Sequence, residues 1–184
     1  MRLTSISLLA AASALALAAC DRQADGNNAA TGNAAEAAGD ATIADGLTGD
    51  RRFAEAAKSA GLDRTLDGPG PYTVLVPSDA AFDKLPAGAL DTLMKPESRA
   101  ELTRLLTFHV LPGTILAEDI GKAIDNGGGK ASLATMGGGT LTATKEGNVI
   151  VLADAAGGKA RVTQADDKRS NGVIHRVDSV LMPS

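Results

Sequence analysis

The chain has 184 residues, enough for one domain with additional segments, and its formal net charge of −4 gives no indication of a basic surface for nucleic acid. Aromatic residues make up only 2% of the sequence and tryptophan is absent, so the stacking side chains needed by single-strand binders are scarce. The single cysteine excludes an intrachain disulfide and a cysteine-based zinc site.

The first 19 residues have the three-part layout of a secretory signal peptide. Arg2 precedes an apolar stretch over residues 3–17, and small residues follow. The stretch is short and rich in alanine, whereas a membrane-spanning helix needs about 20 strongly apolar residues. We therefore set residues 1–19 apart from the fold and expect an exported protein.

Cys20, the only cysteine, directly follows this segment. The run Leu17-Ala18-Ala19-Cys20 resembles the bacterial lipobox, which implies that the thiol is lipidated, the peptide is cut before Cys20 and the new N-terminus is acylated. The alternative is cleavage at Ala14-Leu15-Ala16, which would leave a free thiol on a secreted protein. Because more than one acyl chain anchors a protein stably, the lipobox predicts an envelope lipoprotein, periplasmic or surface-exposed. It leaves the choice of membrane open.

Residues 20–40 are predicted to be the lipidated cysteine and a flexible tether. From residue 21 onward this segment carries almost no large apolar side chain, so it cannot bury enough surface to offset its ordering entropy. The pattern changes at about residue 41. Residues 41–184 are predicted to form a single domain, because roughly 140 residues can bury about two-thirds of their surface in one core.

Short helices dominate the first half of this domain. Apolar residues at helical spacing predict a helix over residues 51–60 that Gly61 closes. A turn cluster at 67–71 precedes a buried strand at 72–77. Ser78 is a suitable N-cap for the next short helix, and a further helix is expected after Pro86.

One helix contains the first of the two histidines. Ser98 and Glu101 have the spacing of a capping box, which predicts that the helix starts there. Four residues then follow at positions i, i+3, i+4 and i+7: Leu102, Leu105, Leu106 and His109. His109 is therefore predicted on the buried stripe of the helix, near its C-terminal end.

Strands dominate the second half. A short strand at 114–116 and a helix at 118–124 are predicted first. Further strands, separated by glycine-rich turns, are expected at 140–145, 149–153, 160–164 and 172–182. Because helices come first and strands later, the pattern indicates an α+β fold.

No catalytic or metal-binding pattern is complete. Residues 127–132 end like a phosphate-binding P-loop, but Ala131 replaces the required Ser or Thr and Ile124 the required Gly. His109 and His175 each lie in an apolar stretch and outside any paired metal-ligand motif. Burial favours neutral imidazole, which needs one donor and one acceptor nearby. We therefore predict two structural histidines, no catalytic residue, no metal, no cofactor and no enzyme.

Three blocks resemble the fasciclin domain family, and the resemblance extends from residue 41 to the C-terminus. They are GPGPYTVLVPSDAAFDKLP at 68–86, LTFHVLPG at 106–113 and SNGVIHRVDSVLMP at 170–183. The resemblance implies a wedge of two packed β-sheets with several helices, and a non-enzymatic module for adhesion. It also implies that the central histidine, His109, is buried and joins neighbouring segments by hydrogen bonds.

The resemblance implies an interaction region as well, from which this chain departs at two places. The family's central Tyr-His pair, proposed to contact integrins in animal members, is Phe108-His109 here, without the phenolic hydroxyl. The Asp-Ile pair before the closing block corresponds to Asp166-Asp167. Both departures weaken any transfer of integrin binding to this chain.

Two functions are therefore compared. The first is an envelope lipoprotein that is held at the membrane by Cys20 and contacts an unknown protein or matrix partner. The alternative is a binder of a lipophilic, carotenoid-like molecule, since some members of the family bind carotenoids; the sparse aromatic residues provide little for a stacking pocket.

Overall fold

The computed structural model describes residues 39–183. The predicted signal peptide, Cys20 and nearly all of the predicted tether lie outside these residues. The helices are α2 (Ile43–Gly46), α3 (Arg51–Ala60), α4 (Asp63–Asp67), α5 (Asp79–Phe82), α6 (Ala89–Leu93), α7 (Arg99–Phe108) and α8 (Ala117–Asn126), with 3₁₀ turns η1 (Leu47–Gly49) and η2 (Pro96–Ser98). The strands are β1 (Tyr72–Pro77), β2 (Val110–Pro112), β3 (Lys130–Ala134), β4 (Thr140–Glu146), β5 (Val149–Ala153), β6 (Lys159–Arg169) and β7 (Gly172–Val177).

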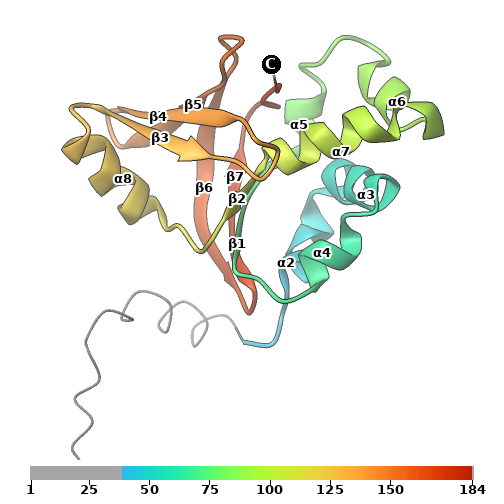
Figure 1. The fold of residues 1–184 in the computed structure, drawn as a ribbon, viewed down its shortest axis with the longest axis horizontal. Helices are drawn as coiled ribbons and strands as arrows, with labels where there is room; N and C mark the ends of the chain where they lie inside the picture. Colours follow the sequence, from blue (N-terminus) through green and yellow to red (C-terminus); the bar gives the residue numbers. More distant parts are fainter. Residues whose placement is uncertain (1–38, 184) are drawn as a thin grey trace, which may run out of the picture.

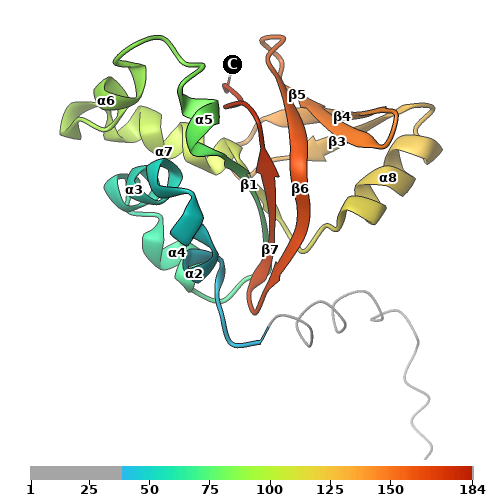
Figure 2. The same ribbon diagram turned by 180° about the vertical axis from the view of Figure 1, so that it is seen from behind.

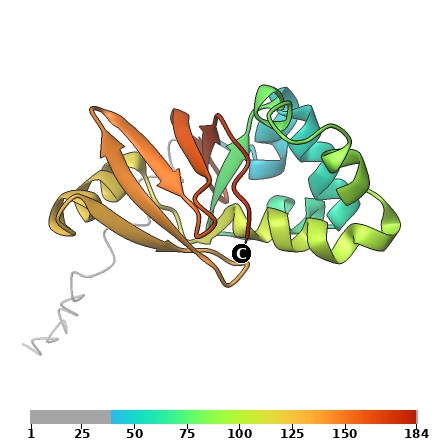
Figure 3. The ribbon, with the colours of Figure 1, turned by 90° about the horizontal axis from the view of Figure 1, so that it is seen from above.

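The described strands form a bent seven-stranded sheet in the order β2-β1-β7-β6-β5-β4-β3 (Figures 1 and 3). Only β1 and β7 are parallel neighbours; the other pairs are antiparallel. The start of β6 pairs with β5 and its remainder pairs with β7 across two register shifts. Such bulges increase the local bend of a strand. The predicted α+β single domain is confirmed; the two predicted sheets are two parts of one continuous sheet, and β6 connects them because it pairs with β5 at its start and with β7 over its remainder.

Strand β1 lies between two apolar clusters. Val74 and Val76 belong to a cluster formed with α2, α3, α4 and α7. Leu75 points to the opposite side and belongs to a cluster formed with α8 and the strands β3 to β6. Figures 1 and 2 show the helices α2 to α7 on one side of β1 and β7, and α8 on the other. A strand covered on both faces needs a continuous apolar run, which explains the sequence YTVLVP.

The chain enters the domain at one end of β6 and β7 and finishes near the other end (Figure 1). At the first end, the Ser170 N–H donates to the Ala41 carbonyl. The buried Asn171 side chain accepts a hydrogen bond from the Ile43 N–H and donates to the Leu66 and Gly68 carbonyls. These contacts bind the start of the domain to the β6–β7 turn. The last described residues lie on the α5 side (Figure 1).

Several predicted elements agree with the structure. The helix over 51–60 ends at Gly61, which has a left-handed φ of 80°, as expected of a C-terminal glycine. The strand at 72–77 matches β1, and the helix at 118–124 lies inside α8. Ser78 occupies the N-cap position of α5, but its side chain makes no capping hydrogen bond.

The predicted strand at 114–116 is wrong, and the strand in this region is β2, four residues earlier. The Ile115 N–H donates to the Thr73 hydroxyl and the Ile115 carbonyl accepts from the His175 ring. Because the Thr73 and His175 side chains bind the Ile115 N–H and carbonyl, these two backbone groups are not available to pair with a neighbouring strand.

The predicted capping box at Ser98 is also wrong. Ser98 is the last residue of the 3₁₀ turn η2, with φ −96° and ψ 9°, and therefore lacks the extended conformation of an N-cap. Its side chain accordingly makes no capping hydrogen bond.

The two final strands differ from prediction in length. Strand β6 continues to Arg169 through its bulges, whereas 160–164 was predicted. Strand β7 stops at Val177, although the prediction extended to residue 182. At this point Asp178 bonds twice to the Arg161 backbone, through its N–H and its carboxylate. The last residues then leave the sheet.

Candidate functional site

His109 is the C-cap residue of α7 and its side chain is 1% exposed. Its Nε2 accepts a hydrogen bond from the Leu181 N–H (3.1 Å), and its Nδ1 lies 2.9 Å from the Leu105 carbonyl oxygen. Because an N–H can only donate and a carbonyl can only accept, the proton is on Nδ1. The neutral ring thereby joins the end of α7 to the C-terminal segment.

His175 on β7 is equally buried and has the opposite tautomer. Its Nδ1 accepts from the Asp166 N–H (3.1 Å), and its Nε2–H donates to the Ile115 carbonyl (2.8 Å). Asp166 has a positive φ of 59°, within the β6 bulge. The imidazole therefore connects the bulge to the segment between β2 and α8.

Burial lowers the pKa of both imidazoles. It lowers the pKa of His109 to about 4, although its hydrogen bond to Leu105 and the charge of Asp154 act in the opposite direction. Burial likewise lowers the pKa of His175 against its hydrogen bond to Ile115 and the nearby Asp166. Both rings are neutral near pH 7, with both nitrogens occupied by backbone groups. Neither nitrogen is available to bind a substrate or a metal ion.

The Phe108-His109 pair, which the sequence singles out as an interaction region, is buried. Phe108 is 3% exposed, and both its ring and that of Phe53 meet the His109 ring edge-on at centroid distances of 6.5 Å. A partner could therefore contact this region in the described conformation only through neighbouring residues.

The carboxylates of Asp166 and Asp167 have separate roles in the bulge. Asp166 accepts the Ala117 N–H, the first N–H of α8. Asp167 is bound by Arg169 (2.7 Å) and Arg176 (2.9 Å). Burial acts to raise the pKa of Asp167, but hydrogen bonds from the two arginines outweigh it and hold that pKa below its usual value. Both carboxylates are thus engaged within the domain.

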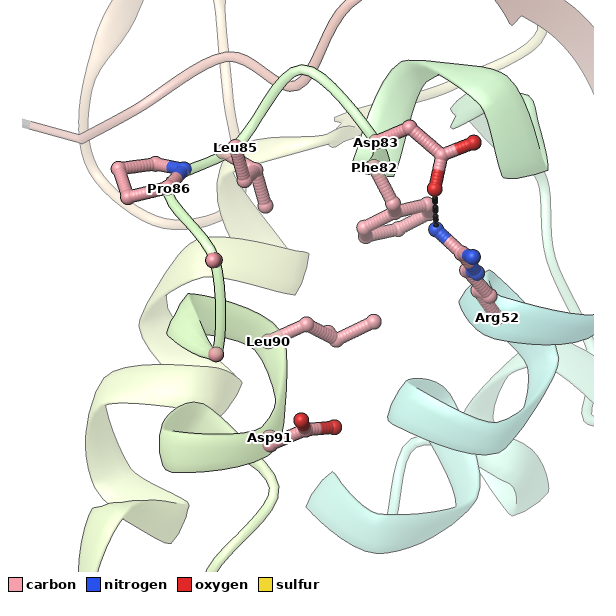
Figure 4. Close-up of a pocket in the computed structure, with 9 residues that line it drawn as sticks. Arg52, Phe82, Asp83, Leu85, Pro86, Leu90 and Asp91 are labelled. Atoms are coloured by element: carbon pink, nitrogen blue, oxygen red, sulfur yellow. Dashed lines mark hydrogen bonds and ion pairs between the residues drawn. The ribbon is translucent and has the colours of Figure 1, made fainter.

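A pocket of about 280 Å³ opens between α3, the end of α5 and α6 (Figure 4). Phe82, Leu85 and Leu90 direct apolar side chains into it, and Arg52, Asp83 and Asp91 add charges around it (Figure 4). Phe82 is 4% exposed, while Leu85 and Leu90 are half-buried and pack against the first apolar cluster. The pocket therefore has an apolar base and a charged rim.

Of the charged side chains that line this pocket, Arg52 and Asp83 bind each other, whereas Asp91 has no such partner among the described residues. The Nη1 of Arg52 binds the Asp83 carboxylate at 2.5 Å and the Asp79 carbonyl at 3.3 Å. Lys84 is not part of the pocket lining and donates to the Asp178 carbonyl at 2.6 Å. Asp91 has neither a hydrogen bond nor an ion pair through its carboxylate among residues 39–183. It is therefore the uncompensated charge of the pocket lining.

Sequence reasoning missed this pocket. The sequence gives only a weak indication of it, namely Pro86 and Gly88 between two short helices. In the structure Gly88 has a left-handed φ of 76°. This turn places the apolar residues of α5 and α6 around a common space. Pairing between Arg52 and Asp83, 31 residues apart, could not be read from local spacing.

Residues 39–183 contain neither a candidate metal site nor a helix that could span a membrane. No group of three or more His, Cys, Asp or Glu side chains in this part of the chain is arranged to hold a metal ion. In the same residues, no helix combines the length and apolar character that crossing a membrane requires.

Comparison with known families gives one match over most of the described residues. The sequence profile described as Fasciclin domain matches residues 50–183. Among curated proteins, Protein sll1483 of Synechocystis sp. is 40% identical over 146 residues, which cover 77% of this chain and 73% of that protein.

Other relatives are similar to this chain over only part of their length. The transforming growth factor-beta-induced protein ig-h3 of Sus scrofa is 35% identical over 70% of this chain and 17% of its own length. Immunogenic protein MPB70 of Mycobacterium bovis is 36% identical over 62% of this chain and 51% of its own length. A solved FAS1 domain pair from the insect cell adhesion molecule Fasciclin I has a similar fold, with a TM-score of 0.57 at 22% identity, covering 71% of this chain and 44% of that one.

Proposed function

The chain belongs to the fasciclin domain family, and from this we propose that it is a bacterial envelope lipoprotein whose domain is a non-enzymatic adhesion or protein-interaction module. The observation that carries the proposal is the family match over residues 50–183, because a relative of the same fold is a cell adhesion molecule. Anchoring is proposed from the lipobox-like residues that end in Cys20.

The position of the described chain start supports a tethered arrangement. About 20 residues separate Cys20 from Ala41, which is held at the β6–β7 turn. A flexible segment of that length has a root-mean-square span of about 25 Å. A membrane anchor would therefore attach on the side of the β6–β7 turn, away from α5 and α6 (Figure 1).

Substitution of Cys20 tests the anchor. The variant Cys20→Ala is expected to move the protein from the membrane fraction to the released fraction, because no thiol remains for lipid attachment. Fractionation of cells followed by immunoblotting measures the distribution, and fatty-acid labelling of the wild type is the positive control. A Cys20→Ala protein that remains in the membrane fraction would contradict the lipoprotein assignment.

Deletion of the gene tests the interaction function. Loss of the protein is expected to reduce surface attachment or cell aggregation, and re-expression of the wild type is expected to restore it. Sedimentation of cell suspensions and adhesion to coated surfaces provide the measurements. Wild-type behaviour of the deletion strain in both assays would remove the basis for an adhesion module.

Binding of a carotenoid-like molecule receives less support from the structure. An almost entirely apolar pocket lies between α3, α4 and α7, lined by residues that include Phe53, Leu62, Leu106, Val110 and Met136. Its volume is about 30 Å³, whereas pockets that hold a small-molecule ligand usually measure about 300 to 1,000 Å³. A polyene could enter only if these helices moved apart, so the interaction module is the better supported function.

A further inference from the structure

We propose that the pocket between α3, α5 and α6 is a docking site for a partner protein's peptide segment that carries a bulky apolar side chain next to a lysine or arginine. The inference deepens the proposed function, on which it rests, by naming the contact surface and the chemistry of its partner. Three properties of the pocket support it: its size, its unfinished apolar packing and its uncompensated carboxylate.

The size of the pocket favours a side chain over a small molecule. Pockets for small-molecule ligands usually range from about 300 to 1,000 Å³ and bury most of the ligand. This pocket measures about 280 Å³ and is open to solvent on one side. It can therefore take one large side chain while the remainder of the peptide lies along the rim.

The apolar packing around the pocket is incomplete. Helix α6 contains no fully buried residue, and Leu90 extends from it into the open space below Phe82 (Figure 4). Leu85 closes the space from above in the same view. An apolar side chain inserted here would contact Phe82, which is already buried, and cover the exposed parts of Leu85 and Leu90, at about 25 cal/mol per Å² of apolar surface buried.

The negative charge of Asp91 in the pocket lining favours a partner peptide that has a lysine or arginine next to the inserted apolar residue. Arg52 already has Asp83 and the Asp79 carbonyl as partners, so it is not available to an incoming anion. Asp91 lies one residue after Leu90 on α6, and its carboxylate points toward the gap that faces α3 (Figure 4). A lysine or arginine beside the inserted residue would pair with Asp91, whereas an acidic partner would be repelled.

The pocket also lies on an accessible part of the domain. The segment from the end of α5 to η2 is distant from the β6–β7 turn at which the chain enters, as the two opposite views show (Figures 1 and 2). If residues 20–40 tether the domain to a membrane, the point of attachment is on the other side of the domain from the pocket (Figures 1 and 2). A partner could reach the pocket without contact with the bilayer.

A displayed library of random heptapeptides, selected on the full chain, tests the proposal. Sequences that place Leu, Ile, Met or Phe beside Lys or Arg are expected to be enriched. The variant Asp91→Lys is expected to weaken their binding by about tenfold or more, since it replaces attraction by repulsion. Selection on Asp91→Lys itself is expected to enrich acidic neighbours instead.

Glu97→Lys is the matched control, because Glu97 is an exposed carboxylate on η2 outside the pocket lining. It makes the same change in net charge and is expected to leave peptide binding within about twofold of the wild type. Equal urea midpoints for the two variants would establish that both are folded. Equal loss of binding in both variants, or enrichment of peptides without a basic residue, would overturn the proposal. So would selection of no peptide at all, or occupation of the pocket by a second copy of the chain.

The outcome for the pocket is distinguishable from that for the general function. Cells carrying Asp91→Lys are expected to lose adhesion in the assays that the deletion strain fails. Normal adhesion of these cells beside a defective deletion strain would overturn the pocket and leave the interaction module intact. A deletion strain without any defect would instead contradict the module itself.

Discussion

Replacement of His109 by alanine is expected to lower the free energy of unfolding by about 3 kcal/mol. Removal of the imidazole leaves the Leu181 N–H and the Leu105 carbonyl without their hydrogen bonds in a buried position. Unpaired buried groups cost about 1–3 kcal/mol. The cavity beside the Phe53 and Phe108 rings adds to this cost, because a packed core collapses only partly around a deletion.

Urea unfolding of the wild type and the His109→Ala variant at pH 7 measures this difference. Thr103→Ala is a control in the same helix, because the Thr103 hydroxyl bonds only to the Arg99 carbonyl of its own helix. A change within about 0.5 kcal/mol is expected for the control. Equal midpoints for wild type and His109→Ala would contradict the structural role of the imidazole.

The fall in stability should be accompanied by release of the C-terminal segment. Leu181 is fully buried, and the following residue, Met182, donates its N–H to the buried Asp154 carboxylate at 2.9 Å. His109 and Asp154 thus hold adjacent positions of the same segment. Hydrogen exchange of the Leu181 amide is expected to become faster in His109→Ala than in Thr103→Ala, since exchange reports local opening.

Local patterns predicted the elements whose packing depends on short-range periodicity. The apolar spacing of residues 51–60 and the continuous run of β1 each determine how an element faces the core, and both were predicted correctly. The burial of His109 followed from its spacing after Leu102 for the same reason. Its main partner, Leu181, is 72 residues away and contributes only a backbone N–H, which leaves no mark on the sequence.

The errors occurred where distant side chains determine the backbone. Thr73 and His175 bind the Ile115 backbone, so a segment with strand-like residues forms no strand. Strand β3 was not predicted because only Leu133 is buried among its five residues, which gives little alternation. The pocket was missed for a related reason. That Asp91 has no cationic partner in the pocket lining depends on the pairing of Arg52 with Asp83, which the sequence does not show.

Acidification is expected to destabilise the domain between about pH 6.5 and pH 4. The pKa of His109 is lowered by burial from 6.5 to about 4, so the unfolded chain binds more protons than the folded chain in this interval. Stability is then fully present above pH 6.5 and falls as the pH drops toward the folded pKa. One such group contributes about 1.4 kcal/mol per pH unit, or about 3 kcal/mol over the interval.

His175 acts in the same direction, because burial lowers its pKa as well. The opposing charges, Asp154 near His109 and Asp166 near His175, reduce the effect without reversing it. Protonation would also place a second N–H of His109 against the Leu181 N–H, and one of His175 against the Asp166 N–H. The loss of stability therefore has an electrostatic and a hydrogen-bonding cause.

Carboxylates contribute in a different pH range. The pKa values of Asp167 and Asp178 are raised by burial but lowered more strongly by their hydrogen bonds and ion pairs, so both stay below the usual 3.8. Their stabilisation is present above that value and is lost only as the pH falls through the lower folded pKa values. A decline that begins near pH 6.5 therefore reports the histidines and not these acids.

Urea unfolding at pH values from about 7 to 4.5 separates the two histidines. The variant His109→Gln cannot ionise and is expected to be less stable at pH 7 but to show a shallower decline, with the remaining slope due to His175. The double variant with His175→Gln is expected to be nearly independent of pH until the carboxylates titrate. A flat wild-type profile over this range, or an unchanged slope in His109→Gln, would show that the buried rings are not the groups that take up protons on unfolding.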